Sequence, residues 1–240
     1  MLVINDASAP GVRYWQRSAV RTAWLGQGAH LLGLSGAVDP AALRSLLLGR
    51  TPGGGPLTAR PGLRRRQGWD LVFAAPKSVS LLAASETGAA APVRQAFWGA
   101  VADAFALLEE RAAWARRGGQ LVAAQGAVAG AFEHSRNDAG QPHLHAHVVL
   151  ANCARLPGTA EDHAQWGCLV GNELWRWREG LGPGFQLALR ARLQGAGLGF
   201  DWELSAGGLG EIRDVGEQDR ASASSRSFAL RAASRSFGSA

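Results

Sequence analysis

The stretch HSRNDAGQPHLHAHVVL, residues 134–150, determines the structure that we expect at the centre of this chain. It contains four of the six histidines. Asn137, Asp138 and Gly140 are residue types that favour turns, whereas the Val-Val-Leu run at its end favours a strand. We therefore predict a β-hairpin that turns near residues 138–140.

This hairpin would bring three imidazoles together. His134 returns opposite the neighbourhood of His145, and His145 and His147 share a face because strand side chains two apart point the same way. Three imidazoles leave room for non-protein ligands, which is typical of a working metal site and not of a structural one. The hairpin thus predicts a metal centre. A single histidine on an apolar face is more often a packed core residue, but three on one converging face favour a metal site. His143 has the same strand parity as His145 and His147 but lies nearer the turn, so it is a weaker candidate.

Helices and strands are both expected along the rest of the chain. Asp39 followed by Pro40 is a favoured helix start, and Phe97, Val101 and Phe105 recur at helical spacing. Residues rich in Gly and Pro predict a loop at 49–62. We expect strands at 2–5, 69–74, 121–132, 143–152, 200–204 and 211–215. We expect helical segments at 12–23, 39–48, 76–84, 92–116 and 171–193, with an interruption at 180–184 as an open alternative.

The end of the chain has a different composition. Residues 221–240 include seven Ser and six Ala, which bury too little apolar surface to order a segment. We expect one domain at 1–215, either whole or shortened at its C-terminal end, and a disordered tail at 216–240.

The net charge of +6 predicts a polyanionic partner, although a bias toward GC-rich codons also explains 24 arginines beside the single lysine, Lys77. Cys153 and Cys168 are too few for a disulfide framework and form no CxxC motif. No apolar run reaches the roughly 18 residues of a membrane helix, and no secretory signal is visible. We therefore expect a cytoplasmic protein.

Two motifs resemble one protein family. The run GWDLVFAAPKSVS, residues 68–80, resembles the signature of conjugative relaxases of the TrwC/TraI type, the MobF family of the HUH endonuclease superfamily. The histidine run through Asn152 resembles the three-histidine motif of the same family, with the same spacing of eleven and then two. Residues 27–36 and 174–177 add weaker similarity, and the resemblance covers residues 1–215.

The resemblance implies a fold and an activity. The fold is α+β, with a central antiparallel sheet flanked by helices. The activity is metal-dependent nicking and joining of single-stranded or hairpin DNA at a plasmid origin of transfer, through a phosphotyrosine intermediate that initiates conjugation. Accessory relaxosome proteins are implied partners. The implied ion is Mg²⁺ or Mn²⁺, and three neutral imidazoles also suit Zn²⁺.

The resemblance also implies roles for Tyr14 and Asp70. Tyr14, the only tyrosine, would be the nucleophile, although a phenol with a pKa near 10 needs a base or a cation to assist it. Asp70 would orient a histidine and help to deprotonate the tyrosine. Many relatives carry two pairs of N-terminal tyrosines, whereas this chain can hold one covalent DNA end at a time. Tyr14 resembles the first pair by its distance from the N-terminus and the second pair by its spacing to the next tryptophan.

Basic residues near these motifs are candidates for phosphate contacts, which give salt-dependent affinity without sequence choice. They are Arg13, Arg17, Arg64, Arg65, Arg66 and Lys77.

Two other functions remain open. The chain could be a truncated remnant that binds DNA without cleaving it, or an HUH nuclease of the replication-initiator type. The second is less favoured, because initiators usually carry the tyrosine after the histidine motif. No GxxxxGK[ST] phosphate loop occurs in the sequence, so we expect no helicase activity in this chain.

Overall fold

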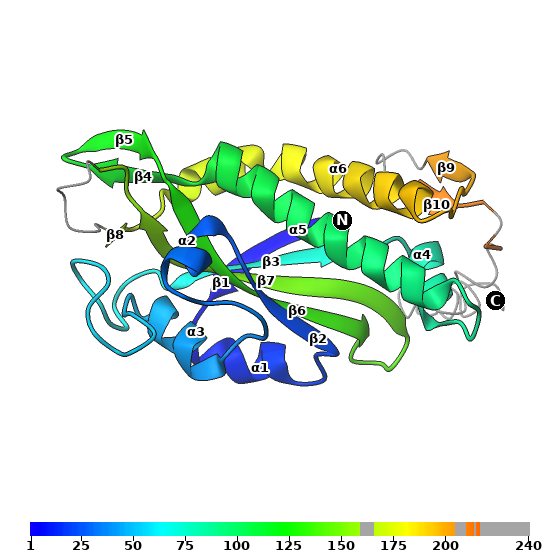
Figure 1. The fold of residues 1–240 in the computed structure, drawn as a ribbon, viewed down its shortest axis with the longest axis horizontal. Coiled ribbons are helices and arrows are strands. Elements are labelled where there is room, and N and C mark those ends of the chain that lie inside the picture. The colour runs from blue at the N-terminus through cyan, green and yellow to red at the C-terminus, as the bar shows by residue number, and fades with distance from the viewer. Residues whose placement is uncertain (159–165, 205–209, 214, 217–240) are drawn as a thin grey trace, which may run out of the picture.

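The computed structural model describes residues 1–158, 166–204, 210–213 and 215–216. At its centre lies an antiparallel sheet (Figure 1). The strands follow the order β1 (Leu2–Ala7), β3 (Gly68–Ala74), β7 (Pro142–Arg155), β6 (Gly126–Arg136) and β2 (Arg21–Leu25), and β8 (Trp166–Gly167) pairs with the end of β7. Helices cover the sheet, so the predicted α+β class is confirmed.

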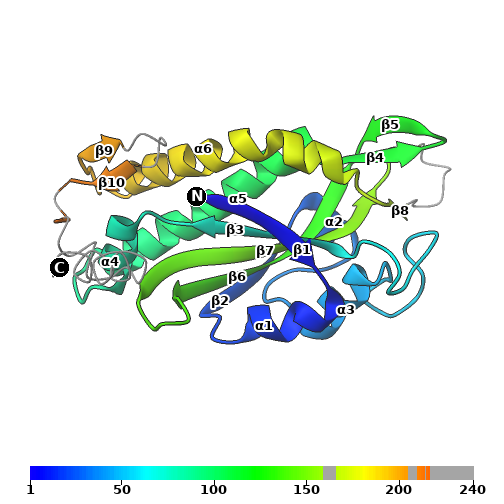
Figure 2. The ribbon, with the colours of Figure 1, turned by 180° about the vertical axis from the view of Figure 1, so that it is seen from behind.

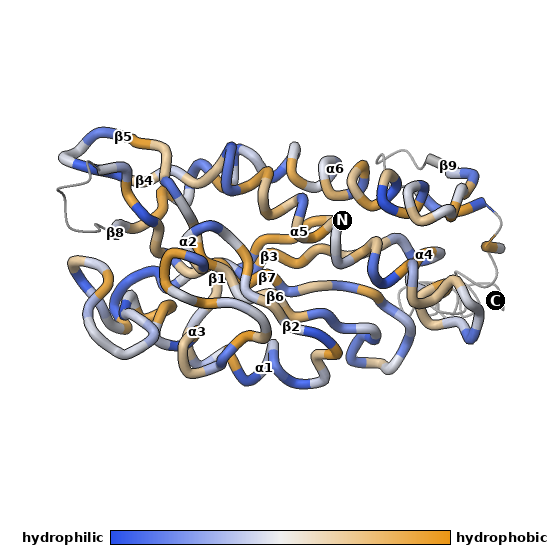
Figure 3. The backbone as a smooth tube through the Cα atoms, in the orientation of Figure 1, coloured by the Kyte–Doolittle hydropathy of each residue, from blue (hydrophilic) through white to orange (hydrophobic). Residues whose placement is uncertain are grey.

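Helices cover both faces of the sheet. On β7, Leu144, Val148 and Leu150 pack with α5 (Ala90–Ala112) and α6 (Gly171–Gly195). Val149 and Ala151 point to the other face, where α1 (Val12–Gln16), α2 (Gln27–Leu31) and α3 (Pro40–Leu47) lie. Both faces of β7 are buried, so residues 148–151 form a continuous apolar run (orange in Figure 3), whereas three histidines alternate with Leu144 and Ala146 over residues 143–147.

Smaller elements lie at the two ends of the sheet (Figures 1 and 2). At one end, β4 (Trp114–Arg117) and β5 (Gln120–Ala123) form a separate two-stranded ribbon. At the other end, α4 (Lys77–Ala84) lies beside the hairpin of β9 (Trp202–Leu204) and β10 (Gly210–Ile212). A short 3-10 helix, η1 (Ala9–Gly11), precedes α1. None of the described helices is long and apolar enough to cross a membrane.

The prediction of a helical segment at residues 12–23 is correct for its first part and wrong for its second. Helix α1 ends at Gln16, and Ser18 at φ 62° turns the chain before β2. Strand β2 forms because its backbone pairs with β6, from Arg21 opposite Glu133 to Leu25 opposite Ala129. This pairing partner lies more than a hundred residues away, so tertiary contact overrides the local pattern.

The strand expected at residues 121–132 is two strands, and the helix expected at 92–116 ends at Ala112. The reason is the β4–β5 ribbon, whose two-residue turn is Gly118-Gly119 with both residues at positive φ. Such a pair is a strong hairpin signal. Helix α6 continues through Pro183, so the interruption at residues 180–184 is not present.

The other expected elements are confirmed within a few residues. Asp39 caps α3, since its carboxylate accepts from the backbone N–H groups of Ala41 and Ala42. The predicted tail lies outside the described residues, apart from Gly216.

Candidate metal centre and adjoining groove

The β6–β7 hairpin positions the three histidines as the sequence predicts. His134 on β6 lies directly opposite His145 on β7, and the chain reverses through Asn137 to Gly140, whose φ is 76°. His145 and His147 lie on the face of β7 that carries α1. The register is therefore the one that the spacing of the histidines requires.

The three imidazoles form a compact buried cluster. Their ring centroids are 5.1–5.3 Å apart, and one ligand nitrogen from each lies within 4.8 Å of the others. Each residue is less than 10% exposed. Among the residues that the structure describes, no other group of three such ligands is found. The donor set and its spacing fit a divalent ion with open coordination positions.

Hydrogen bonds fix which nitrogen of each ring carries the proton. His147 Nδ1 lies 2.8 and 2.9 Å from the carboxylate oxygens of Asp70. His145 Nδ1 lies 2.8 Å from the carbonyl oxygen of His143, and His134 Nε2 lies 2.9 Å from that of Trp15. These oxygens only accept, so each ring nitrogen beside them must donate. The other nitrogen of each neutral ring keeps its lone pair for a metal ion.

Burial keeps at least two of these rings neutral. Desolvation by burial, with a smaller contribution from the neighbouring histidines, lowers the pKa of His145 to about 4. The pKa of His134 is also lowered, chiefly by burial. A metal ligand must be a neutral imidazole, so this environment favours the ligand form at neutral pH.

Asp70 links the metal centre to α1. It lies on β3, and its carboxylate accepts both from His147 and, at 3.0 Å, from Trp15 Nε1. The backbone oxygen of Trp15 accepts from His134. Trp15 thus holds two parts of the cluster and fixes α1 against it. No local sequence pattern distinguishes Trp15 from the other eight tryptophans.

Tyr14 lies at the mouth of the cluster. It precedes Trp15 on α1, its side chain is 58% exposed, and its ring stands edge-on to His147 at a centroid distance of 5.7 Å. A groove of about 670 Å³ opens beside it. Residues from α1 and the hairpin line this groove, among them Tyr14, Arg17, His134, Arg136, His143 and His145. The sole tyrosine is therefore both accessible and next to the candidate metal ligands.

The basic candidates from the sequence differ in their surroundings. Arg17, which directly follows α1, lines the groove, and Arg13 is exposed on α1. Lys77 donates to the carbonyl oxygen of Pro142 at 2.9 Å, and desolvation lowers its pKa. These three residues lie on the elements that surround the metal centre.

The arginine run lies at the other end of β3. Arg64 is exposed. Arg65 braces the fold, since its guanidinium donates to the Thr58 hydroxyl and to the Asn152 carbonyl oxygen. Arg66 lies 3.5 Å from Asp6. The run is thus not part of the groove beside Tyr14.

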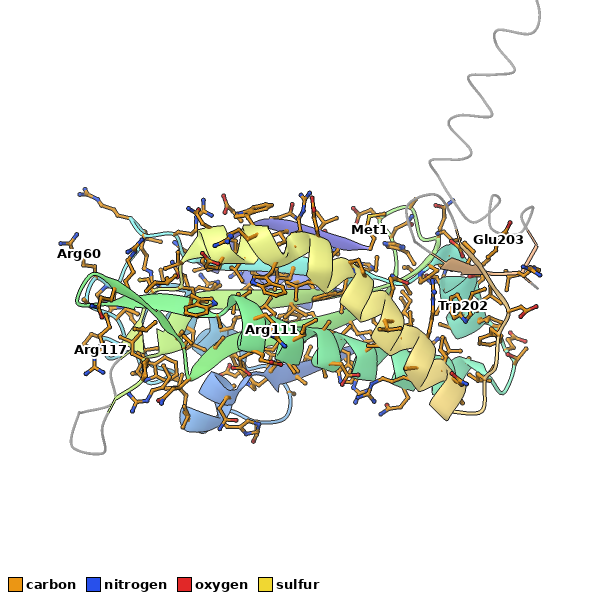
Figure 4. The ribbon with its side chains drawn as sticks, turned by 90° about the horizontal axis from the view of Figure 1, so that it is seen from above. Met1, Arg60, Arg111, Arg117, Trp202 and Glu203 are labelled. Carbon is orange, nitrogen blue, oxygen red and sulfur yellow. The ribbon has the colours of Figure 1, made fainter. Side chains whose placement is uncertain are left out.

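A second basic pocket was not expected from the sequence. It has a volume of about 410 Å³ and lies between the 49–62 loop, the β4–β5 ribbon and β8. Arg60, Arg116 and Arg117 line it together with Trp166. Figure 4 shows Arg60 and Arg117 together at this end of the molecule. The Gly118-Gly119 turn is the signal that could have predicted the ribbon.

The chain is similar to known proteins in sequence and in fold. Residues 4–240 match the family described as TrwC relaxase. The multifunctional conjugation protein TraI of Escherichia coli is 31% identical over 234 residues. That match covers 92% of this chain and 13% of the relative, so the chain spans a small part of the relative's length.

Solved structures of similar fold contain metal and DNA. The metal-bound structure of the conjugative relaxase TrwC with oriT DNA has a TM-score of 0.82 at 28% identity, and the match covers 98% of this chain and 84% of that one. TrwC complexed with a 27-mer DNA, comprising the recognition hairpin and the cleavage site, has a TM-score of 0.81 at 28% identity. That match covers 99% of this chain and 84% of the other.

Proposed function

The chain belongs to the TrwC relaxase family, and on that premise we propose that it nicks and rejoins single-stranded DNA at a plasmid origin of transfer. One observation carries the proposal. The only tyrosine is exposed on a groove and lies edge-on to a ring of the buried three-histidine cluster. This arrangement supports Tyr14 as the nucleophile and the histidine cluster as the site of phosphate activation.

We propose that the hydroxyl oxygen of Tyr14 attacks the scissile phosphorus. The new bond joins the tyrosine to the 5′ phosphate, and the bond to the 3′ oxygen of the preceding nucleotide breaks. The tyrosine loses one proton and the leaving 3′ oxygen gains one, so the reaction needs no other reactant. Attack by a 3′ hydroxyl on the phosphotyrosine reverses the step and joins the strand.

The histidines and Asp70 prepare the site for this step. His134, His145 and His147 would hold a divalent ion, which would polarise the scissile phosphate and offset the charge of the transition state. Asp70 keeps His147 in the tautomer that binds metal. We propose Mg²⁺ or Mn²⁺ as the ion, with Zn²⁺ as an alternative that three imidazoles also accept.

We propose that the DNA contacts both ends of the sheet. The strand to be cut would lie in the groove beside Tyr14, where Arg17 and Arg136 can meet its phosphates. The hairpin part of an origin would meet the pocket of Arg60, Arg116 and Arg117. Because the substrate would be plasmid DNA, we propose a cytoplasmic location and accessory proteins at the origin as further partners.

The decisive experiment is adduct formation. Labelled oligonucleotides from the neighbouring origin region, each with a hairpin and a candidate cleavage site, are mixed with the protein and Mn²⁺ or Mg²⁺, then run on a denaturing gel. We expect a covalent band that EDTA prevents and that Tyr14→Phe abolishes. Trp177→Phe, which changes an exposed aromatic residue on α6, is the control and should leave the band unchanged. Binding without any adduct would make the chain a DNA-binding remnant.

A further inference from the structure

The regular pairing of strand β7 with its neighbours becomes irregular just before the candidate metal ligands. On one side, the last pair with β3 joins Ala74 to His145. On the other side, the register with β6 shifts between His134 and Arg136. Beyond this shift Pro142 still pairs with Arg136, and the Leu144 carbonyl oxygen accepts from the Ala75 N–H at 3.0 Å. The sheet pairing of residues 142–144, which lead directly into His145, is therefore sparse and irregular.

The first turn of α4 supplies further hydrogen-bond partners for these residues. The Leu144 N–H donates to Ser80 Oγ at 3.0 Å, and this hydroxyl donates in turn to the Pro76 carbonyl oxygen at 3.0 Å. Lys77 Nζ donates to the Pro142 carbonyl oxygen at 2.9 Å. Ser80 and Leu144 are each only 1% exposed, so water cannot replace this bond.

The same turn is held from its other side by the β9–β10 hairpin. The Glu211 carboxylate accepts from the backbone N–H groups of Lys77 at 3.0 Å and Ser78 at 2.8 Å, and from Ser78 Oγ at 2.5 Å. The Ile212 N–H donates back to Ser78 Oγ at 2.8 Å. A carboxylate at a helix N-terminus satisfies unpaired donors and interacts well with the helix dipole. The turn is therefore a fixed support and not a frayed helix end.

We infer that Ser80 and Lys77 are positioning residues for the metal centre. Leu144 is held by its buried side chain and by its hydrogen bond to Ser80. The backbone position of the next residue, His145, is therefore fixed as well. The His145 ring would then be held in place beside His134 and His147, where the three imidazoles can bind one ion. This inference rests on the proposed metal centre. It assigns a function to two side chains of the 68–80 motif that are not themselves metal ligands.

The test measures metal binding without DNA. Purified protein is titrated with Co²⁺, and the visible absorption of the bound ion reports its coordination geometry. We expect Ser80→Ala to weaken Co²⁺ binding by on the order of tenfold and to change the absorption spectrum. Ser80→Thr keeps the hydroxyl and should restore both. Ser85→Ala is the matched control, because the Ser85 hydroxyl bonds within α4 at its far end.

The outcomes separate this inference from the proposed function. Wild-type protein that binds no Co²⁺ would overturn the metal centre and this inference together. Tight wild-type binding that Ser80→Ala leaves unchanged, even with a lower melting temperature, would overturn the inference alone. If Ser80→Ala fails to fold, Lys77→Met is the deciding variant. A threefold or greater loss of Co²⁺ affinity in Lys77→Met supports the positioning role, and wild-type affinity overturns it.

Discussion

The polar side chains near the two ends of strand β7 differ in how deeply they are buried. At the His145 end, the three imidazoles are buried and each has a ring nitrogen bonded to a fixed acceptor. At the other end, beside Arg155, the pocket of the β4–β5 ribbon is lined by Arg60 and Arg116, which are exposed.

This difference in burial suits two different proposed functions, catalysis at one end and DNA binding at the other. Chemistry on a phosphate needs groups held close to their final geometry before the substrate arrives, because later ordering would raise the barrier. Binding of a nucleic-acid backbone tolerates long side chains that adjust to each phosphate. One rigid sheet therefore joins a prearranged end to an adaptable end, and mutations at the two ends should affect different measurements.

The largest effect is expected at the prearranged end. His145→Gln removes one of three ligands, so the rate of adduct formation should fall by on the order of a hundred- to a thousandfold. Affinity for a labelled origin hairpin, measured by fluorescence anisotropy, should stay within about twofold. An equal loss of hairpin affinity would mean that the two ends do not act separately.

A smaller effect is expected at Asp70, which hydrogen-bonds the candidate ligand His147. Asp70→Asn keeps the side-chain shape but weakens the hold on the ring of His147, so metal affinity should fall by about 10- to 100-fold. Isothermal titration with Mn²⁺ measures this directly. Asp6→Asn, at an exposed acid on β1, is the matched control and should bind Mn²⁺ like the wild type.

The adaptable end should respond to salt. Arg60→Ala combined with Arg116→Ala should reduce hairpin affinity by about tenfold and lower the slope of log affinity against log salt by about 2, one contact each. Cleavage of a short oligonucleotide that lacks the hairpin should not change. Arg111→Ala, at an exposed arginine on the α5 face (Figure 4), controls for lost charge. A loss of short-oligonucleotide cleavage would place these arginines in the reaction itself.

A further effect concerns the stability of the metal-free protein at low pH. Folding lowers the pKa of His145 from 6.5 to about 4, so between these values the unfolded chain binds more protons than the folded one. The metal-free protein should therefore lose stability as the pH falls from 6.5 toward 4, and this contribution should be constant above 6.5. Thermal melting in EDTA measures it. His145→Gln should flatten the dependence, whereas His30→Gln, at an exposed position on α2, should not.

Local patterns predicted the hairpin well, because strand parity alone fixes which histidines share a face. The spacing from His134 to His145 needed only a turn between them, and the turn residues were visible. The edge strand β2 could not be predicted, since its partner β6 is distant in sequence. For the same reason the role of Trp15 was hidden: it depends on how α1 packs on β3, which no local pattern records. The support from Ser80 likewise needed the structure.

The position of Tyr14 would also allow a spectroscopic label on this residue to report metal binding and reaction. Because the chain has one tyrosine, biosynthetic incorporation of fluorotyrosine would place a single fluorine-labelled ring in the whole molecule. That ring stands 5.7 Å from the ring of His147, so a paramagnetic ion bound by the histidines would broaden its resonance strongly. A single spectral line would then follow both the entry of metal and the conversion of the hydroxyl to a phosphodiester, in intact protein and without a radioactive substrate.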